Sequence, residues 1–356
     1  MRAIQADRGP PGAFRPLLVF REGSYLNPSQ TAESSRGDEE ASQPTQTEAS
    51  EAVVEARGLT KRYDDFEAVA GVEFMVKPGE VFGMLGPNGA GKSTTMRMIY
   101  RVTPITSGTL SVLGLTAGRD DRRIKAQLGV VPQLDNLDEQ LTVMDNLLVY
   151  ARFNELGPKL ARRRAEELLA FLELAPKAKA RIRDLSGGMQ RRLTLARGLM
   201  NDPKMVILDE PTTGLDPQVR LTLWDKLEEL RAKGVTLIMN KHYMDEAERL
   251  CDRLVIMDKG RIVAEGSPRK MVREQVSPEV IEARLEGNDF ARLEHHAKRL
   301  GAEVQRAGDR VSLFVNDGRE VLRSLAEDSI FLNGAFVRPG NLEDVFLKLT
   351  GRALRE

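Results

Sequence analysis

Residues 81 to 93 read Val-Phe-Gly-Met-Leu-Gly-Pro-Asn-Gly-Ala-Gly-Lys-Ser, and this stretch decides the fold. The apolar run Val81–Leu85 predicts a buried strand, and residues 93–100 predict a helix. Between them, residues 86–93 match the pattern G-x-x-x-x-G-K-S. A glycine-rich loop between a strand and a helix can bind phosphate, because its backbone N–H groups and the helix N-terminus face the same anion. The stretch therefore predicts a nucleotide-binding α/β domain.

Each residue type in this loop has a chemical reason to be there. Glycines let the backbone turn its N–H groups inward, the Lys92 ammonium is expected to reach the β- and γ-phosphates, and the Ser93 hydroxyl is expected to bind Mg²⁺. A purely structural glycine turn is the alternative, and the strand before the loop and the helix after it disfavour it. The residues expected to contact the nucleotide are Gly86, Pro87, Asn88, Gly89, Ala90, Gly91, Lys92, Ser93 and Thr94.

Two adjacent carboxylates support the same site. Asp209 and Glu210 directly follow the apolar run Met205–Leu208, so they are expected at the carboxyl end of a strand, where α/β folds bind ligands. Asp209 can hold Mg²⁺ through water, and Glu210 can polarise a water for in-line attack on the γ-phosphate. An acidic cap on a strand end is the alternative, but it does not explain a pair of carboxylates followed by Pro211.

The overall composition limits the possible partners. Lys and Arg together number 53, as do Asp and Glu, so the formal net charge is zero and no global basic field attracts nucleic acid. Cys251 is the only cysteine, which excludes an internal disulfide and fits the reducing cytoplasm. No apolar run is long enough to cross a bilayer, and residues 17–20 are too short a run for a signal peptide. If the protein works at a membrane, another chain is expected to span it.

The pattern along the chain predicts a large domain followed by a small one. Residues 1–51 are expected to be a disordered extension, because much of this segment is polar; a segment that folds on a partner is the alternative. Residues 52–267 are expected to form a P-loop NTPase domain of α/β class, with parallel strands at 205–208 and 235–239 and a closing hairpin over 254–264.

Two further features complete this organisation. A helical subdomain is expected over about residues 134–185, and its apolar stripe at helical spacing predicts packing: Leu160, Ala165, Leu168, Leu169 and Leu172. Residues 268–356 are expected to form a small α+β accessory domain in the order β-α-β-β-α-β, with a hairpin turn at 308–309 and a last amphipathic helix over 342–349.

A second anion-binding motif carries a family resemblance. Residues 185–190 read Leu-Ser-Gly-Gly-Met-Gln and open a helix, so Ser186, Gly187 and Gly188 offer another phosphate-type site. This run resembles the signature motif of the ATP-binding-cassette (ABC) ATPases, in which it acts on the ATP held by a partner subunit. The resemblance covers about residues 53–266 and implies an ABC ATPase core.

The resemblance assigns roles to matching residues elsewhere in the chain. Tyr63 resembles the aromatic that stacks on adenine, Gln133 the glutamine that senses Mg²⁺ and the attacking water, and Asp216 the loop that crosses the dimer. His242 resembles the switch histidine that contacts the γ-phosphate, although Asn240 and Lys241 replace the small residues that usually precede it. The residues implied to contact the nucleotide across the dimer are Ser186, Gly187, Gly188, Gln190 and Asp216. The residues implied in catalysis are Glu210, His242, Gln133 and Lys92. The residues implied at Mg²⁺ are Ser93, Gln133 and Asp209.

The sequence around 243–253 and the tail over 341–351 resemble the ATPase branch of daunorubicin and nodulation-factor exporters. The resemblance implies ATP and Mg²⁺ as cofactors, a homodimer as the working form, and a separate ABC-2 type permease as partner. It also implies a place on the cytoplasmic face of the inner membrane and the export of a drug-like, lipid or lipo-oligosaccharide substrate. A soluble ABC ATPase without a permease and an importer ATPase are the alternatives.

Overall fold

The computed structural model describes residues 52–241, 244–285, 290–330 and 332–351. The extension expected over residues 1–51 lies outside these ranges. None of the helices in the described ranges combines the length and the apolar composition that are needed to cross a membrane.

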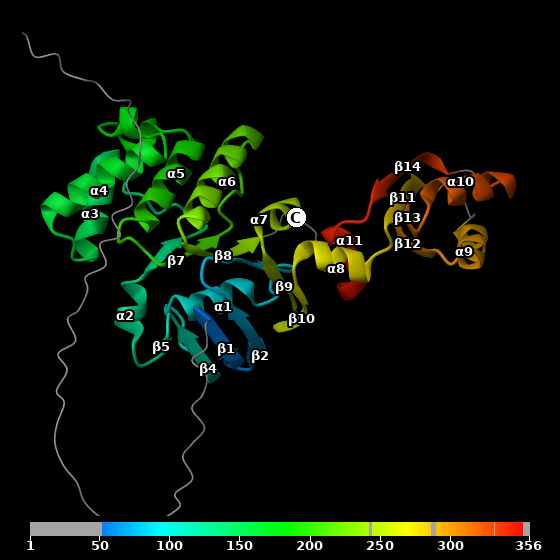
Figure 1. Ribbon diagram of the computed structural model, residues 1–356, viewed down its shortest axis with the longest axis horizontal. Helices are drawn as coiled ribbons and strands as arrows, with labels where there is room; N and C mark the ends of the chain where they lie inside the picture. The colour runs from blue at the N-terminus through cyan, green and yellow to red at the C-terminus, as the bar shows by residue number, and fades with distance from the viewer. Residues whose placement is uncertain (1–51, 242–243, 286–289, 331, 352–356) are drawn as a thin grey trace, which may run out of the picture. The chain divides into compact units, whose positions relative to one another are not determined.

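A six-stranded sheet forms the centre of the nucleotide-binding part (Figure 1). Its strand order is β10-β9-β3-β8-β7-β6, and all pairings are parallel except that of β9 with β10. The strands are β3 (Val81–Leu85), β6 (Leu128–Val131), β7 (Met205–Asp209), β8 (Thr236–Lys241), β9 (Arg253–Asp258) and β10 (Arg261–Gly266). Every residue of β3 and β7 is buried, as strands covered on both faces should be. The predicted parallel sheet and closing hairpin are confirmed.

A second, antiparallel sheet covers helix α1 (Lys92–Ile99). Its order is β2-β1-β4-β5, formed by β1 (Val54–Tyr63), β2 (Phe66–Val76), β4 (Ser107–Val112) and β5 (Leu115–Thr116). Apolar residues of this sheet, of α1 and of one face of the central sheet share one buried cluster. The short helix α2 (Asp121–Lys125) follows and leads into β6. This packing holds the start of α1, and hence the phosphate loop, between two sheets.

Helices form the other layer of the nucleotide-binding part. They are α3 (Val143–Phe153), α4 (Pro158–Phe171), α5 (Gly187–Gly198) and α6 (Pro217–Ala232), with short 3-10 turns at Ala175–Lys177 and Ile182–Asp184. The predicted helical insertion is confirmed, and four of the five residues of its predicted stripe are buried. Leu160 is the exception, because it is 42% exposed. Ala161 and Ala165 lie four residues apart on the buried face of α4, and Leu160 lies one position off that spacing.

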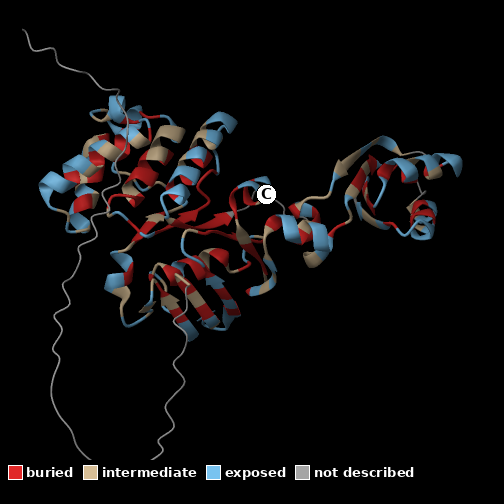
Figure 2. Cartoon of the chain, in the orientation of Figure 1, coloured by how far each residue is buried: buried red, intermediate tan, exposed pale blue. Residues whose placement is uncertain are grey.

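The C-terminal part forms the predicted β-α-β-β-α-β unit. Its sheet has the antiparallel order β12-β13-β11-β14 and its own apolar cluster, seen as buried residues inside the unit in Figure 2. The elements are β11 (Glu279–Arg284), α9 (Phe290–Arg299), β12 (Glu303–Ala307), β13 (Arg310–Val315), α10 (Gly318–Glu327) and β14 (Asn333–Pro339). Helix α8 (Pro268–Gln275) precedes this unit and was not predicted, because its eight residues are mostly charged or polar.

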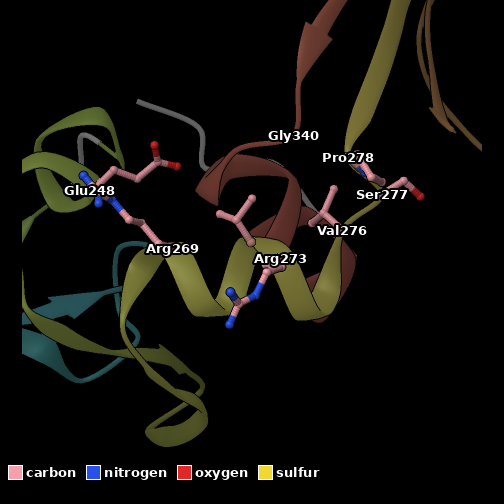
Figure 3. Close-up of a pocket in the computed structure, with 8 residues that line it drawn as sticks. Glu248, Arg269, Arg273, Val276, Ser277, Pro278 and Gly340 are labelled. Carbon is pink, nitrogen blue, oxygen red and sulfur yellow. The ribbon is translucent and has the colours of Figure 1, made fainter. Parts of the chain in front are cut away.

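The last helix, α11 (Leu342–Thr350), packs on the nucleotide-binding part and not in the small sheet's core. Leu342, Val345 and Phe346 are buried in the large apolar cluster, beside helices α8 and α7 (Met244–Leu250). A capping box between Asn341 and Asp344 starts the helix, and the backbone N–H of Leu342 donates to the Glu248 carboxylate on α7. Figure 3 shows the pocket of about 370 Å³ beside this contact; it is lined by Glu248, Arg269, Val272, Arg273, Val276, Ser277, Pro278 and Gly340.

Candidate nucleotide site

The phosphate loop requires glycine at two positions, because each lies too close to a neighbouring strand for a side chain to fit. A Cβ atom at Gly86 would lie 2.2 Å from the Met257 carbonyl oxygen of β9, and one at Gly91 would lie 2.5 Å from the Ala68 carbonyl oxygen of β2. Both glycines also have positive φ, at 152° for Gly86 and 99° for Gly91. The loop is therefore held between a strand of each sheet. The strand, loop and helix follow one another as predicted.

Lys92 lies inside this loop with 4% of its surface exposed. Its Nζ donates to the carbonyl oxygens of Gly86 at 2.7 Å and Pro87 at 2.9 Å. Burial lowers the pKa of Lys92 to about 8, against the opposing effect of the nearby carboxylates of Glu210 and Asp209. A buried ammonium bonded only to loop carbonyls is well placed to exchange those partners for phosphate oxygens.

This lowered pKa predicts a pH dependence of ATP binding. Above about pH 8 the nucleotide-free protein loses the Lys92 proton, so ATP affinity is expected to fall by up to about tenfold per pH unit. Folding stability should change in the opposite direction: the unfolded chain keeps its proton up to a pKa of about 10.5, so stability rises with pH between the two values. Titration of a fluorescent ATP analogue at several pH values measures the first effect. Lys92→Ala should bind weakly at every pH, and the same pH slope in that variant would contradict the assignment.

The carboxylate pair lies at the end of β7, as predicted, and both residues are buried. Glu210 has positive φ, at 47°, which turns the chain sharply after the strand. Its Oε2 accepts hydrogen bonds from Nε2 of Gln133 at 2.8 Å and from Oγ1 of Thr213 at 3.3 Å. Gln133 and Glu210 are 77 residues apart in the chain, so the fold brings together two residues that the family resemblance assigned to the same water.

The oxygen atoms expected to face Mg²⁺ are also brought together. Nδ2 of Asn240 donates to Oδ1 of Asp209 at 2.7 Å and to Oγ of Ser93 at 3.2 Å, so these two oxygens lie around one amide nitrogen. Hydroxyl and carboxylate oxygens are the ligands that Mg²⁺ prefers, with the remaining positions taken by nucleotide phosphates and water. The side-chain amide nitrogen of Gln133 donates to Glu210. The side-chain oxygen of Gln133 is therefore the atom able to face a cation. The residues present therefore fit Mg²⁺.

The second anion-type motif starts helix α5. Ser186 is the N-cap and accepts from the backbone N–H of Met189 at 3.4 Å, and Ser186 and Gly187 are exposed. A Cβ atom at Gly188 would lie 2.7 Å from Val219, so close packing against the start of α6 needs glycine there. Asp216 is the exposed N-cap of α6 and accepts from Val219 N–H at 2.9 Å.

Side chains near this motif bond within their own segment. Gln190 donates to the carbonyl oxygens of Ile182 and Leu185, which precede α5. The bonds of Ser186, Gln190 and Asp216 therefore shape these helix starts and do not reach the phosphate loop of the same chain.

Of the two remaining residues implied by the resemblance, the structure describes Tyr63. Tyr63, at the end of β1, is 44% exposed, and the Lys61 ammonium lies 4.7 Å from its ring centroid. It pairs with Phe66 of β2, which is also exposed and two residues before Ala68 at the phosphate loop. His242 lies outside the described residues, so its role stays a prediction.

Arg191 is a residue of the site that sequence reasoning missed. Its guanidinium, on α5, donates to carbonyl oxygens of two segments, residues 132–133 after β6 and residues 209–211 at the end of β7, and to one carboxylate. The acceptors are Pro211 O at 2.8 Å, Asp209 O at 3.1 Å, Glu210 O at 3.0 Å, Pro132 O at 2.6 Å, Gln133 O at 3.3 Å and Asp135 Oδ1 at 3.0 Å. Only 4% of Arg191 is exposed. A pattern in the sequence could have indicated that Arg191 is buried. The buried face of α5 has helical spacing and consists of Arg191, Thr194, Leu195 and Gly198.

Comparison with known proteins gives two family matches. A model described as "ABC transporter" matches residues 69–213, and one described as the C-terminal domain of the nodulation factor export protein NodI matches residues 290–351. The chain is 42% identical over 308 residues to the Nod factor export ATP-binding protein I of Ralstonia nicotianae, covering 85% of this chain and 95% of that protein. It is 44% identical over 301 residues to the protein of the same name in Rhizobium etli, covering 84% and 93%.

Solved structures show the same fold. A dimeric ATP-binding cassette in a post-hydrolysis state with ADP and phosphate is 27% identical, with a TM-score of 0.55, and the match covers 60% of this chain and 98% of that one. The cassette cbiO1 of Clostridium perfringens, part of an ABC transporter complex, is 27% identical with a TM-score of 0.59, covering 63% and 92%.

The fold and the phosphate loop, together with these matches, define an ABC ATPase, which binds and hydrolyses ATP to drive transport. Within that class, the chain belongs to the family of the Nod factor export ATP-binding protein I, and it is the ATPase subunit of an exporter.

Proposed function

We propose that two copies of this chain bind Mg-ATP between them and drive an ABC-2 type permease from the cytoplasmic face of the inner membrane. The exposed start of α5 carries this proposal. Ser186 and Gly187 present helix N–H groups to solvent, while the phosphate loop on α1 uses its own helix N-terminus for nucleotide. The signature segment of a second copy can therefore contact the phosphates of the ATP that the first copy binds. The dimeric cassette structures support this arrangement.

We assign the site residues to the following roles. Lys92 and the backbone of the loop hold the phosphates, and Ser93, Asp209 and Gln133 hold Mg²⁺, which neutralises phosphate charge when bound. Glu210, kept in place by Gln133, accepts the proton of the attacking water. Tyr63 stacks on adenine, Asp216 and the Ser186 segment contact the nucleotide of the other copy, and His242 contacts the γ-phosphate.

For the substrate we propose a lipo-oligosaccharide of the nodulation-factor type. Support comes from the names of the relatives and from the match of residues 290–351 to the C-terminal domain of a nodulation factor export protein. The division into an N-terminal extension, a nucleotide-binding domain over 52–267 and an accessory domain over 268–356 is part of the same proposal. Helices α8 and α11 pack into the nucleotide-binding core, so the accessory part is tied to the motor.

Inside-out membrane vesicles that contain this chain and the candidate permease provide the test. Addition of Mg-ATP is expected to drive a labelled lipo-chitooligosaccharide into the vesicles, and vesicles with Lys92→Ala should accumulate almost none, because that variant binds the phosphates too weakly. A simple sugar without the acyl chain serves as the control substrate. If the chain hydrolyses ATP but neither binds the permease nor changes its ATPase rate in the presence of the permease, the result would count against the exporter. It would favour a motor without a permease.

A further inference from the structure

Asn240 occupies a position that the family resemblance marked as unusual. It lies on β8, between β7 and β3, directly opposite Asp209 in the ladder. Asn240 is 1% exposed, and both hydrogens of its Nδ2 are used: one bond goes to Oδ1 of Asp209 at 2.7 Å and the other to Oγ of Ser93 at 3.2 Å. A carboxylate cannot donate, so the nitrogen of the amide must face Asp209. Asn240 therefore ties two strands to the start of α1.

The oxygen of the same amide, Oδ1, is a buried acceptor beside the expected Mg²⁺ ligands. Among the described residues, Oδ1 of Asn240 has no hydrogen-bond partner, although it is buried. A buried polar atom without a partner costs about 1–3 kcal/mol, so most buried polar atoms bond to the protein or to ordered water. A water in the first shell of a bound Mg²⁺ would be a donor of the right kind at this place.

We propose that Asn240 is a positioning residue for Mg²⁺, which fixes the orientation of the Ser93 hydroxyl and the Asp209 carboxylate before the metal binds. Each Nδ2 hydrogen uses one lone pair of its acceptor and leaves the others directed elsewhere. Outer hydrogen bonds of this type orient metal ligands, and their loss typically lowers metal affinity about 10- to 100-fold. A threonine hydroxyl at this position could offer one donor, whereas Asn240 offers two.

Binding of ADP to the full-length chain, with excess Mg²⁺ or with EDTA, tests this inference by calorimetry and without turnover. Asn240→Leu keeps the branching and the number of heavy atoms of the side chain and removes both donors. It is expected to bind metal-free ADP within about twofold of wild type, while the affinity of the ADP-bound protein for Mg²⁺ falls about 10- to 100-fold. Asn240→Thr keeps one donor and should lose less. Asn201→Leu is the matched control, because Nδ2 of Asn201 also donates two hydrogen bonds, to the carbonyl oxygens of Ala126 and Leu128, away from the phosphate loop.

The outcomes separate this inference from the proposed function on which it rests. If Mg²⁺ does not change the ADP affinity of the wild type, the proposed metal site itself is wrong. If the wild type responds but Asn240→Leu responds equally, only the role of Asn240 is wrong. If Asn240→Leu lowers the affinity for metal-free ADP as much as the affinity for Mg²⁺, Asn240 is a packing residue. If the variant binds Mg²⁺ more tightly, the Asn240 amide competes with the metal. Either result overturns the inference. Should Asn240→Leu fail to fold, Asn240→Thr decides the question.

Discussion

Replacing Glu210 by glutamine is expected to lower ATP hydrolysis by about 100-fold or more and to leave a stable ATP-bound dimer in solution. Glutamine has the same shape and keeps a side-chain oxygen that can accept from Gln133 and Thr213, so the loop geometry should persist. What the variant loses is the carboxylate that takes a proton from the attacking water. Nucleotide then stays intact between the two copies, and size-exclusion chromatography with light scattering measures the dimer with and without ATP.

A second substitution controls for the origin of this dimer. Ser186→Arg in the Glu210→Gln background places a bulky cation at the exposed start of α5, away from the phosphate loop of its own chain. It should leave ATP binding by the monomer close to normal and prevent the dimer. If the double variant still dimerises with ATP, the signature segment does not act across the dimer. A strictly monomeric Glu210→Gln protein at saturating ATP would contradict the mechanism more directly.

Arg191→Ala is expected to lower the free energy of unfolding by about 3–5 kcal/mol, and the ATPase rate of the folded fraction by about tenfold or more. The guanidinium joins the loop that carries Gln133 to the turn after Asp209, and its removal leaves buried carbonyl oxygens and the Asp135 carboxylate without their donor. Urea unfolding gives the stability loss. Rates measured under conditions where each variant is folded give the loss of positioning.

Arg192 provides the matched control for this prediction. It is the next residue of the same helix, but its partners within the described ranges are the Leu172 carbonyl and the Glu173 carboxylate, in the helical layer. Arg192→Ala should cost about 1–2 kcal/mol, because it loses one hydrogen bond to a carbonyl and one ion pair, and it should leave the ATPase rate close to wild type. Equal effects of the two substitutions would show that Arg191 acts through the general stability of α5. Arg191→Lys, which keeps the charge but not the fork of donors, should fall between wild type and Arg191→Ala.

The outline of the fold could be predicted because its signals are local. Short apolar runs become strands buried on both faces, and the small C-terminal unit shows its order in alternating strand and helix patterns. Helix α8 was not predicted because its apolar residues are few: Met271 and Val272 form a single pair between charged and polar residues. The position of α11 was not predicted either. Its amphipathic pattern predicted a buried face, but not that α7 and α8 would cover that face.

By itself, the sequence determined that this chain binds nucleotide, because residues 81–93 carry the strand, the phosphate loop and the helix start without a break. Only the tertiary structure decided which distant groups complete the site: Gln133 with Glu210, and Asn240 with Asp209 and Ser93. The physical reason is the order of the central sheet, in which β3 lies between β9 and β8 although both come far later in the chain. Hydrogen bonds between strands that are distant in sequence set that order, and no local pattern of residues records it.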